Sequence, residues 1–104
     1  MTIGELLAEE VADLPATRME TSSDGVIAWS RGGRTFAAVA GDGSSAEFGL
    51  DPAVADAAIR TPDVAASGRG PGWIRFAPAV LDDRAADRAA AWLASAHRRL
   101  GPRD

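Results

Sequence analysis

The chain has 104 residues, 46% of them hydrophobic, and a formal net charge of −4, so it is long enough for one domain with its own core and too short for two. It contains no cysteine, which excludes disulfides, thiol nucleophiles and thiolate metal sites. No apolar run approaches the ~18 residues of a membrane span, and the start MTIGELLAEEV lacks the basic residues of a secretory signal. The sequence therefore predicts a cytoplasmic protein.

The first predicted element is a helix over residues 2–14. Thr2 and Glu5 have the spacing of a capping box. Apolar residues then recur at helical spacing through Leu14, and Pro15 ends the run. The segment that follows, ATRMETSSDG, is predicted to be a polar connector.

Three short strands are predicted next, over residues 26–30, 34–40 and 46–50. Each is short and rich in β-branched, aromatic or alternating apolar residues. Between the first two strands, Gly32 and Gly33 can both take the positive φ of a primed hairpin turn. Short turns between consecutive strands predict an antiparallel meander.

The second half of the chain adds a short helix, a strand and a long helix. Asp51 before Pro52 is typical of a helix start, and this helix ends at Thr61-Pro62. The segment DVAAS is ambiguous between a loop and a brief strand. Residues 73–77, WIRFA, alternate as a strand does, and Asp82 can cap a last helix over residues 83–99.

The predicted order is α-β-β-β-α-β-α, one α+β domain over residues 1–104 whose antiparallel sheet is covered by the N- and C-terminal helices. The apolar positions of the two terminal helices and the second strand should then form the core. The residues expected to be buried are Leu6, Leu7, Val11, Phe36, Trp92 and Leu93.

The segment SGRGPGWIRFAP could be a phosphate-binding loop or a tight turn. It has no lysine and leads into a strand, whereas a Walker loop needs Gly-Lys before a helix. Its glycines also lack the dinucleotide-binding spacing. We therefore interpret it as a turn before an edge strand, with a mobile loop presenting Arg69 as the alternative.

Two further candidate sites, the histidine and the acidic residues of the first helix, have simpler structural explanations. His97 is the only histidine, and its place in a last helical turn favours a helix-dipole role over catalysis. Glu5, Glu9 and Asp13 form a helical acidic stripe that could attract a hard cation, but a solvated helix face is favoured. We predict no catalytic residue, cofactor or metal site.

The three tryptophans, Trp29, Trp73 and Trp92, are predicted to pack in the core, although Trp73 beside Arg75 is the one pair suited to base stacking.

The charge is distributed unevenly along the chain. Residues 1–52 hold nine acidic residues against three arginines, and residues 53–104 hold six against eight. An acidic protein would bind DNA only through a local arginine cluster.

Four pieces of the chain, taken in order, resemble the MmcQ/YjbR-like family of small bacterial proteins. They are ADLP at the end of the first helix, RGGRTFAAV, FGLDPAVADAAI and GWIRFAPAVLDD. The resemblance covers nearly the whole chain and implies a CyaY-like (frataxin-like) α+β sandwich. The chain departs from the family pattern at Arg34, where lysine is usual, and in GRGPG, which leaves Arg69 as the loop's only basic residue.

Because some members of this family are labelled DNA-binding, the resemblance implies a non-enzymatic domain that contacts DNA through its hairpin and glycine loop. The candidate nucleic-acid-binding residues are Arg31, Arg34, Arg69 and Arg75. The alternative is a protein-interaction or regulatory module that uses an exposed sheet face and binds no nucleic acid.

Overall fold

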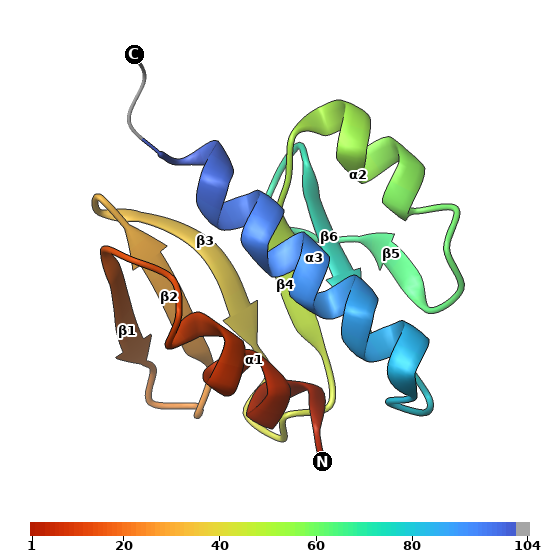
Figure 1. The fold of residues 1–104 in the computed structure, drawn as a ribbon, viewed down its shortest axis with the longest axis horizontal. Helices are drawn as coiled ribbons and strands as arrows, with labels where there is room; N and C mark the ends of the chain where they lie inside the picture. The colour runs from red at the N-terminus through yellow and green to blue at the C-terminus, as the bar shows by residue number, and fades with distance from the viewer. Residues whose placement is uncertain (102–104) are drawn as a thin grey trace.

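The computed structural model describes residues 1–101 and contains three helices and a six-stranded antiparallel sheet (Figure 1). The elements are α1 (Ile3–Val11), β1 (Thr17–Thr21), β2 (Ile27–Arg31), β3 (Arg34–Val39), β4 (Ala46–Gly49), α2 (Pro52–Ala58), β5 (Val64–Ala66), β6 (Trp73–Phe76) and α3 (Asp83–Arg99). The strand order is β1-β2-β3-β4-β6-β5. The α+β class is confirmed, and the predicted meander is β2-β3-β4.

The predicted helix starts are confirmed by their caps. At α1 the Thr2 hydroxyl accepts from the Glu5 backbone N–H, and the Glu5 carboxylate accepts from the Thr2 backbone N–H at 3.0 Å. These hydrogen bonds, the backbone one first, lower the pKa of the exposed Glu5 carboxyl. Asp51 and Asp82 likewise accept from backbone N–H groups in the first turns of α2 and α3. The glycine turn is also confirmed, because Gly32 and Gly33 have φ values of 60° and 79°.

The predicted element order was wrong at one place, because part of the expected connector is strand β1, which pairs antiparallel with β2. The sequence TRMET carries no alternation of apolar and polar residues, so no periodic signal marks it as a strand. Its backbone groups find their partners in β2, which is a tertiary contact.

The short segment DVAAS, which the sequence left open, contains strand β5. This strand has three residues and pairs with the outer side of β6. The expectation that β6 is an edge strand was therefore wrong, because β6 lies between β4 and β5. A strand of three residues is too short to show a pattern of its own, so only its pairing identifies it.

The core lies between one face of the sheet and the helices α1 and α3, which cross in front of that face in Figure 1. The short helix α2 adds Ala55 and Ala58 to the same core. The largest fully buried side chains are Trp29, Phe36, Phe48, Phe76, Leu7, Leu50, Ile74, Leu93 and Val39. None of the helices within residues 1–101 is long and apolar enough to cross a membrane.

Trp92 of α3 lies between two phenylalanines of the sheet. Its ring is 6.1 Å from the ring of Phe48 and 5.1 Å from that of Phe76, which it meets edge to face. Leu7, Phe36 and Leu93 are buried, as predicted, whereas Trp92, Leu6 and Val11 are only partly buried.

We expect Trp92→Ala to lower the free energy of unfolding by about 3 kcal/mol, because both phenylalanines lose their aromatic partner and a cavity forms. Denaturant unfolding measures this, with the exposed Arg99→Ala of the same helix as the control. A loss below about 1 kcal/mol would show that Trp92 contributes little beyond a surface residue.

Candidate functional site

Within residues 1–101 no helix covers the second face of the sheet, and we call it the open face. One row of aligned residues crosses it from edge to edge, since side chains of directly paired residues share a face. In strand order the row is Glu20, Ala28, Ala38, Glu47, Arg75 and Ala65. Ala38 is 1% exposed yet lies outside the core cluster, because it belongs to the opposite face of the sheet.

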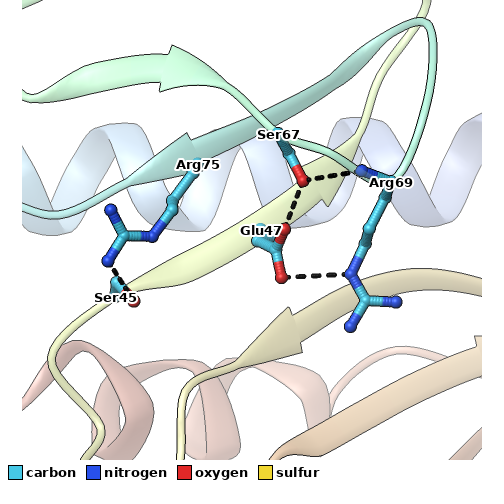
Figure 2. Close-up of polar contacts among 5 residues, drawn as sticks. All are labelled: Ser45, Glu47, Ser67, Arg69 and Arg75. Atoms are coloured by element: carbon cyan, nitrogen blue, oxygen red, sulfur yellow. Dashed lines mark hydrogen bonds and ion pairs between the residues drawn. The ribbon is translucent and has the colours of Figure 1, made fainter.

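A polar cluster stands on this face over β4 and β6 (Figure 2). The Arg69 guanidinium donates through Nε to Glu47 Oε1 at 3.0 Å. The Ser67 hydroxyl donates to the other Glu47 oxygen and accepts from the Arg69 backbone N–H. The same guanidinium lies 5.4 Å from the ring centroid of Trp73. Arg69 is thus held by a carboxylate and by an aromatic ring.

Arg75 lies beside this cluster and is less constrained. It is exposed, and its one side-chain hydrogen bond within residues 1–101, to the Ser45 hydroxyl, is long at 3.4 Å. It also contributes to the lowered pKa of Asp42, although the hydrogen bonds from Ser44 are the larger cause. The Arg75 guanidinium is therefore available to a carboxylate from outside the molecule.

Two hollows indent the open face along β1. The first, of about 390 Å³, lies against the β2–β3 hairpin, and the second, of about 500 Å³, lies against the β1–β2 turn. Glu20 lines both hollows, and Arg69 reaches the second from the opposite side. Asp24 also lines the second hollow, and the hydroxyl of Ser22 lowers its pKa.

The four arginines expected to contact nucleic acid do not converge. Arg69 and Arg75 lie on the open face, whereas Arg31 donates to His97 at the C-terminal end of α3. Arg34 is the cross-strand partner of Arg31 at the hairpin and is exposed. The site predicted from the sequence is therefore divided between the two faces of the sheet.

His97 is a buried packing residue, which corrects its expected role as a helix-dipole residue. It is 5% exposed, and its ring meets Phe36 edge to face at 5.3 Å. Nε2 lies 2.7 Å from the Pro15 carbonyl oxygen, and Nδ1 lies 3.2 Å from the Arg31 guanidinium. Both contacts are satisfied by a neutral ring that carries its proton on Nε2. Helix position alone could not reveal these partners, because they come from distant segments.

One residue of the acidic stripe of α1 has a structural role, because the Glu5 carboxylate belongs to the capping box of that helix. In the part of the chain that the structure describes, no group of three or more potential metal-ligating side chains is brought together. Trp73, expected in the core, is instead half-buried on the open face.

Sequence reasoning missed Glu47 and Glu20 as residues of the open face. Glu47 could have been found, because it stands between Ala46 and Phe48 in a strand, where alternation directs it away from the core. Its partner Arg69 lies 22 residues further along the chain, and only the fold brings the two together. Comparison with models of known protein families gives no match to this chain, and comparison with curated proteins gives none either.

Proposed function

We propose that this chain is a non-enzymatic protein-interaction domain that binds a partner protein through the open face of its sheet. One observation carries the proposal: the core and the helices occupy one face, and the other presents Trp73, Arg69 and Arg75 together. Tryptophan and arginine are the residues most enriched in the energetically dominant parts of protein interfaces.

The arrangement also supports a chemistry for the partner. Glu47 already neutralises Arg69, so Arg75 is the cation of this polar cluster that can pair with an incoming group. The Trp73 ring stands next to it on the same strand face, two residues away. We therefore propose a partner segment that places a carboxylate at Arg75 and an apolar side chain against Trp73.

Two observations weigh against the other function classes. Both ring nitrogens of the only histidine have intramolecular partners, which leaves that ring without a free site for proton transfer. The acidic side chains of Glu20 and Asp24 line the same face as Arg69, which disfavours a phosphate backbone there. Membership of the MmcQ/YjbR-like family remains our proposal from the sequence resemblance, supported by the observed sandwich of helices on one sheet face.

A matched pair of charge reversals tests the proposal. Arg75→Glu reverses a charge on the open face, and Arg84→Glu reverses a charge at an exposed position of α3. A partner captured by the wild-type chain and then purified should bind Arg75→Glu at least about tenfold more weakly, and bind Arg84→Glu within about twofold of wild type. Calorimetry measures both. If both variants lost affinity for the partner equally, or if neither lost any, the open face would not be the binding surface.

A second arm of the experiment uses random duplex DNA. The wild-type chain should bind it no better than about 10⁻⁴ M at physiological salt. Fluorescence anisotropy would overturn the proposal if it showed sub-micromolar binding that weakened steeply with salt and was lost in an Arg34→Ala, Arg69→Ala variant. That result would favour the DNA-binding function implied by the resemblance.

A further inference from the structure

Strand β1 leaves one edge of the sheet free. It is the first strand in the sheet order and, among the residues that the structure describes, pairs only with β2. Figure 1 shows no other helix or strand beside it. Proteins usually protect such an edge with proline, a bulge, a covering segment or charged side chains. Along Thr17–Thr21 β1 has no proline, and the one register shift nearby lies between β2 and β3. Its two charged residues, Arg18 and Glu20, have opposite signs and can pair with each other across two copies of the strand.

The hydrogen-bond pattern shows which backbone groups face outward. The Ser22 N–H donates to the Val26 carbonyl, so these two residues extend the ladder between β1 and β2. Because antiparallel ladders alternate, the backbone groups of Arg18 and Glu20 face β2. Those of Thr17, Met19 and Thr21 therefore point away from the sheet, where a new strand could pair with them.

The sequence of β1, TRMET, is complementary to itself when it is paired antiparallel about Met19. If two copies of the strand pair in that register, Met19 of one copy lies opposite Met19 of the other. Arg18 of each copy then lies opposite Glu20 of the other copy. The threonines at the two ends also face each other. A register centred on Arg18 or on Glu20 instead places two like charges directly opposite, which is destabilising.

The exposed side chains agree with this register. Arg18 and Glu20 lie on the open face with Ser30 and Ala28. Met19 lies on the other face and is 60% exposed. Contact with Met19 of the partner subunit would remove that apolar surface from water.

We infer that β1 is a pairing edge for a second copy of this chain, so that one sheet runs through both copies about a two-fold axis at Met19. The hollows that border β1 would then adjoin those of the other copy, joining the two open faces into one surface. This pairing does not depend on the partner protein proposed above.

The dimer should be weak, because a strand of five residues provides a contact only about 17 Å long. We expect dissociation in the range of about 10 μM to 1 mM. Sedimentation equilibrium should show an average mass that rises with concentration from 10.7 kDa towards twice that value.

Charge reversals on β1 test the register. Arg18→Glu gives a strand with two acidic residues, and Glu20→Arg gives one with two basic residues. Each variant alone should dimerise about tenfold more weakly than wild type, or worse. An equimolar mixture should regain dimers, because opposite charges face each other again. The double variant Arg18→Glu, Glu20→Arg should also regain them. Two charge reversals at exposed positions far along the chain are the matched controls, Asp56→Arg in α2 and Arg60→Glu just after it. Both should leave dimerisation unchanged.

The location of the contact has its own readout. In hydrogen exchange, the amides of Thr17, Met19 and Thr21 should gain protection as concentration rises, while those at the β5 edge should not. A chain that stays monomeric up to about 1 mM would overturn the inference. So would a dimer that either reversal leaves intact, or a mixture of the two variants that forms no more dimer than each alone.

Discussion

Replacement of Gly72 by alanine should lower the free energy of unfolding by about 3–5 kcal/mol. Gly72 lies in the turn before β6 with φ +81°, a conformation that costs an alanine about 1–2 kcal/mol. A Cβ at this position would also stand 2.3 Å from the Leu50 carbonyl oxygen. The Leu50 oxygen belongs to the backbone, so it cannot move aside as a flexible side chain could. The Gly72 carbonyl also accepts a hydrogen bond from the Leu50 N–H at 2.9 Å, and separating the two segments would break it.

Gly68, in the same loop, provides the matched control. An added Cβ there meets nothing within 4 Å, and its φ is not positive. Gly68→Ala should therefore change stability by less than about 1 kcal/mol, and a small gain is expected because alanine restricts the unfolded chain. Denaturant unfolding compares the two variants. Equal stability of Gly72→Ala and Gly68→Ala would contradict the close approach between the turn and Leu50.

Replacement of His97 by alanine should cost about 2–4 kcal/mol. The buried ring fills space against Phe36 and joins three distant segments, because it contacts the Pro15 carbonyl and the Arg31 guanidinium from α3. Removing it leaves a cavity and takes away the shorter of the two hydrogen bonds at the Pro15 carbonyl, which also accepts from the Thr17 hydroxyl at 3.4 Å. The neighbouring Arg98→Ala, at an exposed position, should change stability by less than about 0.5 kcal/mol.

A second variant separates packing from hydrogen bonding at this position. His97→Phe keeps an aromatic ring beside Phe36 but cannot donate to the Pro15 carbonyl or accept from Arg31. We expect it to cost about 1–3 kcal/mol, because two hydrogen bonds of the ring are lost and one of them is to a charged guanidinium. Thermal or denaturant unfolding measures it. If His97→Phe were as stable as wild type, the ring would serve packing alone.

The sequence predicted well wherever a local rule acts. The capping box at Thr2, the Asp51-Pro52 start and the paired glycines of the hairpin depend on neighbours within a few residues, and all three are present. The long helix was predicted with the bounds that the structure has, 83–99, because its apolar stripe is long and capped by Asp82. Ile74 and Phe76 lie on the buried face of β6, opposite Trp73 and Arg75, although Trp73 had been predicted to pack in the core.

The candidate site could be predicted only in part. Trp73 and Arg75 were assigned to one face of a strand, and they do share the open face. The sequence also selected Arg69 for its loop, but its ion pair with Glu47 and its contact with Trp73 join segments that only the sheet brings together. Grouping Arg31 with these residues failed, because its side chain turns to α3 on the other side of the sheet.

The sequence by itself thus determined the class of fold, the meander and the starts of the helices, since each follows from spacing, capping or turn chemistry within a short stretch of chain. The first two helices end earlier than predicted, at Val11 and Ala58. The tertiary structure decided what depends on distant partners. β1 and β5 are strands because β2 and β6 satisfy their backbone groups, although neither has a pattern of its own. His97 is a core residue because Pro15, Arg31 and Phe36 converge on it. The open face exists because all the helices pack on the opposite side, and no local signal in the chain encodes that choice.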